Sequence, residues 1–180
     1  KSTLFPSRTL FRSGAKEVLL IGELALKPRI QGGGSSHINT ARIDSFAEQF
    51  EKYGIKVTYA RGYKSTSFQR NYRLEKEAVE KVQNAVKRGV PILFFGGLTD
   101  IAEGEGFDRE TYALPGNQTA LLERLLKETD QIGFLSFGGS PYDMELPSEC
   151  SALLQFYLAG EAVADAGVRI ILGRTNPSGK

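Results

Sequence analysis

The chain has 180 residues, of which 41% are hydrophobic and 24% charged, and these proportions are typical of a globular domain with a substantial core. A net charge of +2 without any basic block gives no electrostatic support for nucleic-acid binding. The single cysteine, Cys150, excludes an internal disulfide and a cysteine-based metal cluster. The single histidine, His37, restricts any zinc site or Ser-His-Asp triad to that residue. We therefore expect neither a metal nor a cofactor.

The start of the chain has no apolar signal region, and no apolar stretch reaches the length of a membrane span. These features and the single cysteine favour the cytoplasm, and no membrane partner is expected. The chain begins without Met and stops in a turn at residues 176–180. We therefore expect it to be a piece of a longer protein.

Residues 1–15 are irregular and are interpreted as a connecting arm, and residues 16–180 as one domain. Apolar or alternating runs predict strands at residues 17–22, 55–60, 91–96, 131–137 and 151–157. Apolar residues at helical spacing predict helices at about 40–53, 74–88, 117–127 and 160–172.

The first of these helices should start at Asn39 or Thr40 and end at Gly54, with Ile43 and Phe46 on its apolar face. Asn117 is the expected cap of the third.

Strands that alternate with helices indicate an α/β fold with a mostly parallel sheet. The prediction is a three-layer α/β sandwich, with five or six strands and helices on both faces. Strands 17–22, 91–96 and 131–137 should be central, because they are apolar on both faces. Right-handed crossovers then bring the loops after the strands to one edge, where open α/β sheets bind ligands.

One of these loops contains the run EGEGFDR at residues 103–109, between the buried strand 91–96 and the turn LPGNQ. Glycines beside carboxylates let a backbone approach a substrate closely. The Asp108–Arg109 pair beside Glu103 and Glu105 can keep one acid ionised while burial keeps a neighbour protonated. Without further information, a solvated acidic turn explains the run equally well.

A second loop carries KPR at residues 27–29 and QGGGSS at residues 31–36. The glycine-rich run is not a phosphate-binding P-loop, since no Gly-Lys-Ser/Thr follows. It is also not a dinucleotide fingerprint, because the strand ends at Gly22, about ten residues too early. Lys27 and Arg29 are suited to holding a carboxylate or a hydroxyl, although isolated basic residues are commonly only solvated.

Several runs together resemble the C-terminal α/β sandwich domain of glycoside hydrolase family 3, the family of many β-glucosidases. The runs occur in the family's order: VLLIG at 18–22, KPR at 27–29, QGGGSS at 31–36, EGFDR at 105–109, LPGNQ at 114–118, GSP at 139–141 and NPSGK at 176–180. The resemblance covers nearly the whole chain from residue 17 onward.

The resemblance implies a retaining glycosidase that acts on β-glucosides. Its nucleophilic aspartate would lie in a preceding (β/α)8-type barrel domain, the expected partner. The acid/base would be the glutamate directly before Gly-Phe-Asp-Arg, which is Glu105, with Glu103 as the competing candidate. Asp108 and Arg109 would pair with each other and structure the loop. The residues expected to contact substrate are Arg29, Gln31, Ser35, Ser36 and Glu103.

The sequence departs from the family pattern at Met144–Pro147 and at Gly160–Val163, which puts the local loop geometry in doubt. The barrel is absent from this chain, so we expect the chain to be inactive alone. It should self-associate if the face that would meet the barrel is apolar. The alternative is a free-standing carbohydrate-binding or interaction module without catalysis.

Overall fold

A computed structural model of the chain describes residues 15–35, 37–177 and 179. Residues 1–14 of the predicted arm and Ser36 lie outside the described residues. One sheet contains five strands, all parallel, in the order β2-β1-β3-β4-β5. The strands are β1 (Glu17–Ile21), β2 (Lys56–Ala60), β3 (Ile92–Gly97), β4 (Ile132–Phe137) and β5 (Ala152–Tyr157). The predicted central position of β1, β3 and β4 is therefore confirmed.

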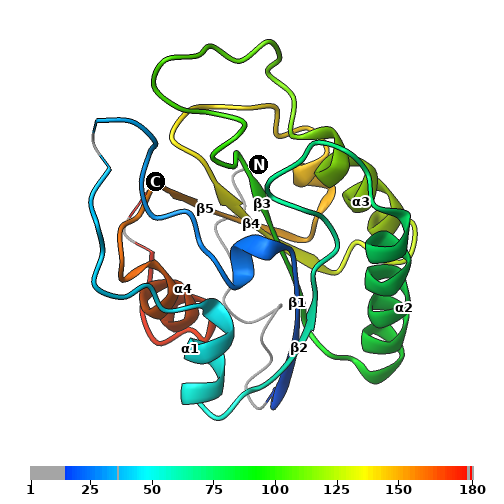
Figure 1. Cartoon of the computed structure of the whole chain (residues 1–180). Coiled ribbons are helices and arrows are strands. Elements are labelled where there is room, and N and C mark those ends of the chain that lie inside the picture. The colour runs from blue at the N-terminus through cyan, green and yellow to red at the C-terminus, as the bar shows by residue number, and fades with distance from the viewer. Residues whose placement is uncertain (1–14, 36, 178, 180) are drawn as a thin grey trace.

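Four helices cover the sheet, α1 and α4 on one face and α2 and α3 on the other (Figure 1). Their bounds are Phe46–Lys52, Tyr72–Arg88, Gly116–Leu126 and Val163–Ile171 for α1 to α4. Two short 3-10 helices, η1 (Glu23–Ala25) and η2 (Pro147–Glu149), were not predicted. The described chain forms the three-layer α/β sandwich expected from its sequence. None of the described helices has the length and apolar character needed to cross a bilayer.

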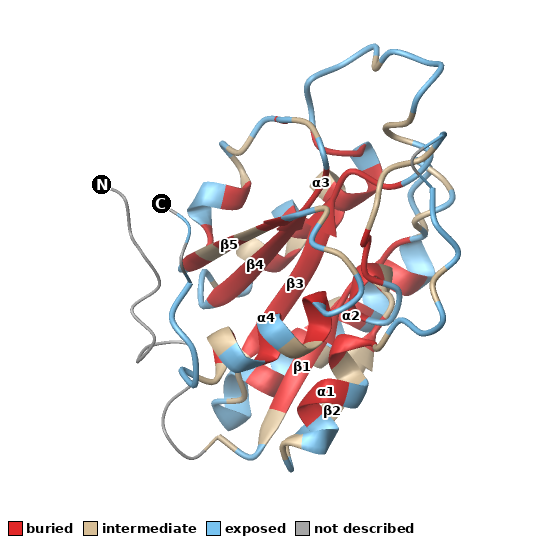
Figure 2. Cartoon of the chain, turned by 90° about the vertical axis from the view of Figure 1, so that its left-hand side faces the viewer, coloured by how far each residue is buried: buried red, intermediate tan, exposed pale blue. Residues whose placement is uncertain are grey.

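Neighbouring residues of each central strand enter different cores, since side chains alternate between the faces of a sheet. In β3, Leu93 and Phe95 pack with α1 and α4, whereas Ile92 and Phe94 pack with α2 and α3. All six residues of β3 and all six of β4 are buried. The buried strands therefore form a rigid centre, while the exposed loops lie at its ends (Figure 2).

Helix α1 starts later than predicted. Ser45 is its N-cap and forms a capping box with Glu48, so the helix begins at Phe46 rather than near Asn39 or Thr40. Ile43 lies before the helix and is exposed, so its predicted place on the apolar face is wrong. The two reciprocal hydrogen bonds of the capping box fix the boundary, which the apolar spacing alone does not reveal.

Asn117 does not cap α3, whose N-cap is Pro115. The buried Asn117 amide instead donates to the carbonyls of Lys64 (3.0 Å) and Ser67 (2.7 Å). Asn117 therefore attaches the loop after β2 to the start of α3, a tertiary contact that overrides the local capping preference.

The end of β3 is fixed by a close backbone approach to β4. Gly97 has φ +132°, and a Cβ at this position would lie 1.9 Å from the carbonyl oxygen of Phe137. The Gln118 amide also binds the backbone of Gly97. It accepts from the Gly97 N–H (2.8 Å) and donates to the Gly97 carbonyl (2.9 Å). The direction in which the chain leaves β3 is thereby set.

Gly97→Ala should lower the free energy of unfolding by about 3 kcal/mol or more, because the new methyl group meets backbone and the φ value is unfavourable. Urea unfolding measures the loss. Gly116→Ala is the matched control, since its added Cβ has nothing within 4 Å and its φ is not positive. Equal stability of the two variants would contradict the close approach.

Candidate active-site loops

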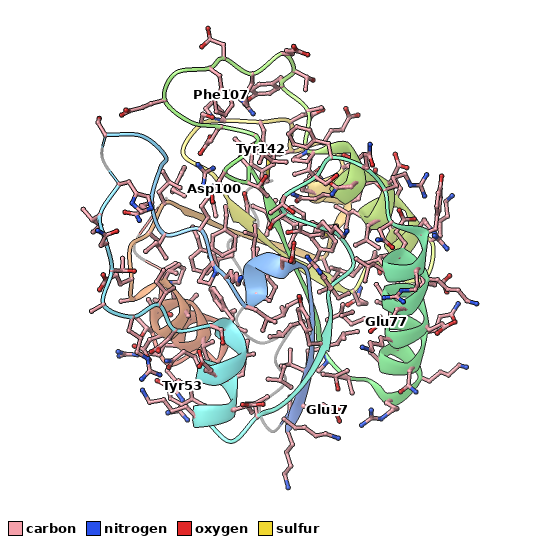
Figure 3. All side chains as sticks on the ribbon, in the orientation of Figure 1. Glu17, Tyr53, Glu77, Asp100, Phe107 and Tyr142 are labelled. Atoms are coloured by element: carbon pink, nitrogen blue, oxygen red, sulfur yellow. The ribbon has the colours of Figure 1, made fainter. Side chains whose placement is uncertain are left out.

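The loops that follow β1, β3 and β4 meet at the carboxyl end of the sheet (Figure 1). Figure 3 labels Asp100 and Phe107 at this end and Glu17 at the opposite end. We call the segment 98–115 the acidic loop and the segment 31–37 the glycine loop. The structure brings the acidic loop into contact with both neighbouring loops through Glu103 and Glu105.

Arg29 lies at the centre of this arrangement and is 5% exposed. Its guanidinium donates to the carbonyl of Leu98 (3.0 Å), to the carboxylate of Glu103 (2.6 Å) and to the carbonyl of Glu103 (3.1 Å). It also lies 3.2 Å from the exposed carboxylate of Asp100. Arg29 therefore holds both the start and the middle of the acidic loop.

Glu103 is enclosed by donors. Its carboxylate accepts from the N–H groups of Gly139 (2.6 Å) and Ser140 (3.0 Å), from the Ser140 hydroxyl (2.5 Å) and from Arg29. Burial alone would raise the pKa of Glu103, but the hydrogen bonds from Ser140 and Gly139 and the Arg29 charge outweigh burial and hold that pKa below its usual value. Glu103 is thus an ionised structural carboxylate that joins three loops.

Glu105 has a different environment, although it is only two residues away. Gly104 and Phe107 pair across a tight turn, which places Glu105 and Gly106 at its exposed tip. The carboxylate accepts from the N–H (2.8 Å) and the hydroxyl (3.1 Å) of Ser35. These two donors, the N–H first, lower the pKa of Glu105, and slight burial opposes them. The Glu105 side chain is exposed to solvent, whereas the Glu103 side chain is 13% exposed and is held by its four donors.

The glycine loop makes few side-chain contacts outside itself. Gln31 donates its amide to the carbonyl of Ile38 (2.9 Å) and accepts from the Ile38 N–H (3.0 Å), which closes the loop. Ser35 contacts Glu105, and Ser36 lies outside the described residues. In this chain, Gln31 and Ser35 therefore bind protein groups and Arg29 binds the acidic loop.

Arg109 does not pair with Asp108 as expected, because no ion pair joins them in the described part of the chain. Its guanidinium donates to the carbonyl of Pro141 (2.5 Å) and lies 5.9 Å from the centre of the Tyr112 ring. Arg109 thus links the acidic loop to the loop after β4.

Two hollows flank the acidic loop. One, of about 580 Å³, is lined by Glu103, Phe107, Arg109, Tyr112 and Ser140, among others. The other, of about 550 Å³, is more apolar and includes Phe68, Ile101, Phe107, Leu114 and Pro115. Four large apolar or aromatic side chains around the acidic loop are exposed, and we call them the apolar rim: Phe68, Ile101, Phe107 and Tyr112. The carboxyl end of the sheet therefore offers both acids and open apolar surface.

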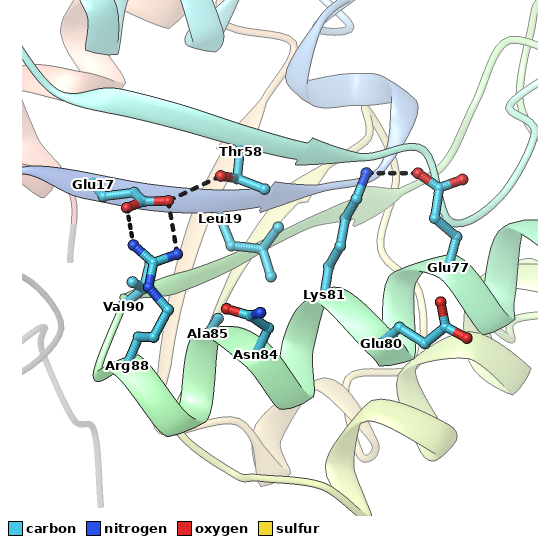
Figure 4. A pocket seen from close by; sticks show the side chains of 10 residues that line it. All are labelled: Glu17, Leu19, Thr58, Glu77, Glu80, Lys81, Asn84, Ala85, Arg88 and Val90. Carbon is cyan, nitrogen blue, oxygen red and sulfur yellow. Dashed lines mark hydrogen bonds and ion pairs between the residues drawn. The ribbon is translucent and has the colours of Figure 1, made fainter.

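A third groove, of about 300 Å³, lies at the opposite end of the sheet between β1 and α2 (Figure 4). Its charges are satisfied within the protein. Arg88 pairs with Glu17, which also accepts from the Thr58 hydroxyl (3.0 Å), and Lys81 donates to Glu77 (2.6 Å). This groove presents no free reactive group to a ligand.

Two partners of Glu103 were missed by the sequence reasoning. Gly139 and Ser140 belong to the GSP run, whose recurrence in the family pattern was the available signal. The Leu98 carbonyl that binds Arg29 has no sequence signal, since every residue carries such a group.

Glu103→Gln should lower the free energy of unfolding at pH 7 by about 2–4 kcal/mol, because the buried Arg29 loses its closest counter-charge. The folded-state pKa of Glu103 is depressed, so its stabilisation is present above the unfolded pKa and is lost as pH falls through the folded value. The difference from wild type should therefore shrink on acidification from pH 7 to pH 3, as followed by urea unfolding.

Glu105→Gln is the control for this measurement, because it alters an exposed carboxylate in the same loop. It should leave the free energy of unfolding nearly unchanged. A larger loss in Glu105→Gln than in Glu103→Gln would reverse the roles assigned to the two glutamates.

Comparison with known proteins agrees with this fold. The sequence model of the Glycosyl hydrolase family 3 C-terminal domain matches residues 9–180. Thermostable beta-glucosidase B of Acetivibrio thermocellus is 34% identical over 91% of this chain and 22% of its own length. The exo-alpha-(1->6)-L-arabinopyranosidase of Bifidobacterium longum is 35% identical over 92% of this chain and 21% of its own length.

Among solved structures, the GH3 beta-glucosidase of Bifidobacterium adolescentis matches with a TM-score of 0.83 and 33% identity, covering 92% of this chain and 24% of that chain. The chain thus spans about a quarter or less of the length of these relatives. Sequence and fold lead to the same conclusion: the chain belongs to glycoside hydrolase family 3, as the α/β sandwich of its C-terminal domain.

Proposed function

We propose that this chain is the acid/base-bearing domain of a retaining β-glucosidase, with Glu105 as the acid/base. The observation that carries the proposal is the contrast between Glu103 and Glu105. Glu103 accepts from four donors and is largely enclosed, whereas Glu105 stands at an exposed tip with one residue donating to it. Of these two carboxylates, we therefore assign the exchange of a proton with substrate to Glu105.

A retaining glycosidase needs a second carboxylate about 5–5.5 Å from the acid/base and across the glycosidic bond. Glu103 cannot take this part, because it belongs to the same loop and all its partners are protein groups. We therefore take the nucleophile from outside this chain. A (β/α)8-type barrel that supplies an aspartate is the partner that the family resemblance implies.

The apolar rim formed by Phe68, Ile101, Phe107 and Tyr112 supports such a partner. These side chains are exposed around the acidic loop, whereas a free-standing domain rarely leaves a large apolar patch uncovered. A barrel seated on this rim would exclude water from Glu105 and bring its aspartate opposite. The relatives of which this chain covers about a fifth include both a β-glucosidase and an arabinopyranosidase. Since this domain is similar to both, we assign the sugar preference to the barrel.

In the proposed mechanism, Glu105 donates its proton to the glycosidic oxygen while the barrel aspartate attacks the anomeric carbon. The carboxylate of Glu105 then removes a proton from the water that hydrolyses the glycosyl-enzyme. The first step needs a protonated Glu105 near neutral pH. Desolvation by the barrel and the nearby aspartate would raise the pKa of Glu105 and oppose the effect of Ser35.

The central test uses a barrel-containing protein that carries Glu105→Ala. Turnover of glucosides with poor leaving groups should fall by about 10²–10⁴, the usual contribution of a general acid. Activated aryl glucosides should still react in the first step, and added azide should restore turnover by replacing the activated water. Glu103→Ala should lose activity through stability and show no azide rescue. Azide rescue of Glu103→Ala alone would move the acid/base to Glu103.

The 180-residue chain by itself should not hydrolyse an aryl β-glucoside, since it lacks the second carboxylate that the double displacement requires. Release of the aryl group is measured with the purified chain and with its Glu105→Gln variant. Turnover that disappears in Glu105→Gln would show that the chain holds a complete site and would contradict the need for a barrel. The non-catalytic module would be favoured if a barrel-containing protein were also inactive.

A further inference from the structure

The Glu105 carboxylate is held by one residue of the glycine loop, through two separate atoms. The Ser35 N–H donates to Oε2 at 2.8 Å and the Ser35 hydroxyl to Oε1 at 3.1 Å. The two donors therefore bind both carboxylate oxygens, which fixes the orientation of the group. The causes that act on the pKa of Glu105 are these two donors and slight burial, with no charged side chain of the described residues among them.

Gly34 makes this approach sterically feasible. It has φ +94°, and a Cβ there would lie 2.4 Å from Oε2 and 2.6 Å from the Cβ of Glu105. The neighbouring Gly33 differs, since its Cβ would meet only the Cα of Gly104, at 3.8 Å. Position 34 thus requires glycine for its backbone angle and for its closeness to Glu105, and position 33 for neither reason.

Two polar side chains of the glycine loop already bind protein groups. Both donors of Ser35 bind Glu105, and the Gln31 amide binds the backbone of Ile38. A sugar hydroxyl that approached Ser35 or Gln31 would have to displace these contacts. Ser35 is therefore better arranged to receive a carboxylate than to bind a glycoside.

We propose that Ser35 is a positioning residue, and that Gly34 and Ser35 form a seat for the Glu105 carboxylate. The role of Glu105 rests on the function proposed above, whereas the seat itself does not. An N–H group can only donate, so it favours the ionised carboxylate. The hydroxyl can also turn and accept a hydrogen bond from the protonated carboxyl group. When Glu105 acts as an acid it must therefore reverse the hydroxyl contact or leave the seat.

The seat is tested on the 180-residue chain by following the carboxyl carbons of its glutamates with ¹³C NMR during a pH titration. In wild type, the pKa of Glu105 should lie below the ordinary value of about 4.3. Ser35→Ala removes one donor and should shift that pKa upward. Ser35→Thr keeps a hydroxyl and should retain most of the wild-type behaviour. A merely structural role of Ser35 would not produce this pattern.

Gly34→Ala should also shift the pKa of Glu105 upward, because its methyl group would occupy the space of the carboxylate. Gly33→Ala is the matched control and should leave the titration unchanged. The pKa of Glu103 in the same spectra reports whether the acidic loop stays folded. Unchanged titration of Glu105 in both Ser35→Ala and Gly34→Ala, with Glu103 as in wild type, would overturn the proposal.

This result and the azide experiment are independent. An upward shift in Ser35→Ala without azide rescue of Glu105→Ala would keep the seat and remove the acid/base role of Glu105. Azide rescue with an unshifted titration would keep the acid/base and remove the seat. If the acid/base role of Glu105 and its seat on Ser35 are both correct, Ser35→Ala in a barrel-containing protein should extend activity to higher pH. The reason is that Glu105 with a raised pKa stays protonated at higher pH.

Discussion

A single buried cation, Arg29, determines the geometry of the loops at the carboxyl end of the sheet. Its guanidinium cannot lose its proton, so burial requires it to be paired and hydrogen-bonded. Glu103 and the Leu98 carbonyl meet this requirement, and Glu103 in turn binds the backbone of Gly139 and Ser140. Three loops, remote in sequence, are thereby held against each other. Arg29 thus anchors the acidic loop at Leu98 and Glu103.

Glu103 and Glu105 are only two residues apart in the acidic loop, yet their environments differ. Glu103 points inward to four donors and is fixed as an anion, whereas the Gly104–Phe107 turn lifts Glu105 to the surface. The anchored residue limits the motion of the exposed one. An exposed carboxylate on an unanchored loop would lose orientation, and orientation is a large part of what a general acid contributes.

The sequence predicted the sandwich, the five strands and the central three, since buried parallel strands are apolar on both faces. It was less successful where tertiary contacts decide. The start of α1 depends on the capping box of Ser45 and Glu48, and Asn117 binds the loop after β2 instead of capping α3. The motif at residues 103–109 lies at the carboxyl end of the sheet as predicted, but no pattern in it shows that Arg109 would bind Pro141 rather than Asp108.

The same pattern could not distinguish Glu103 from Glu105 on physical grounds, because their environments come from Arg29 and Ser35, more than 65 residues earlier in the chain. That separation also bears on the chemistry. All resolved influences on Glu105 within the domain, apart from slight burial, favour its ionised form, which suits the second step of retention. The first step needs the protonated form, which desolvation and a nearby anion would favour. Both would come from a partner that covers the apolar rim. Under the proposed function, the domain by itself favours the base form of Glu105, and assembly with a barrel would make the same residue an acid.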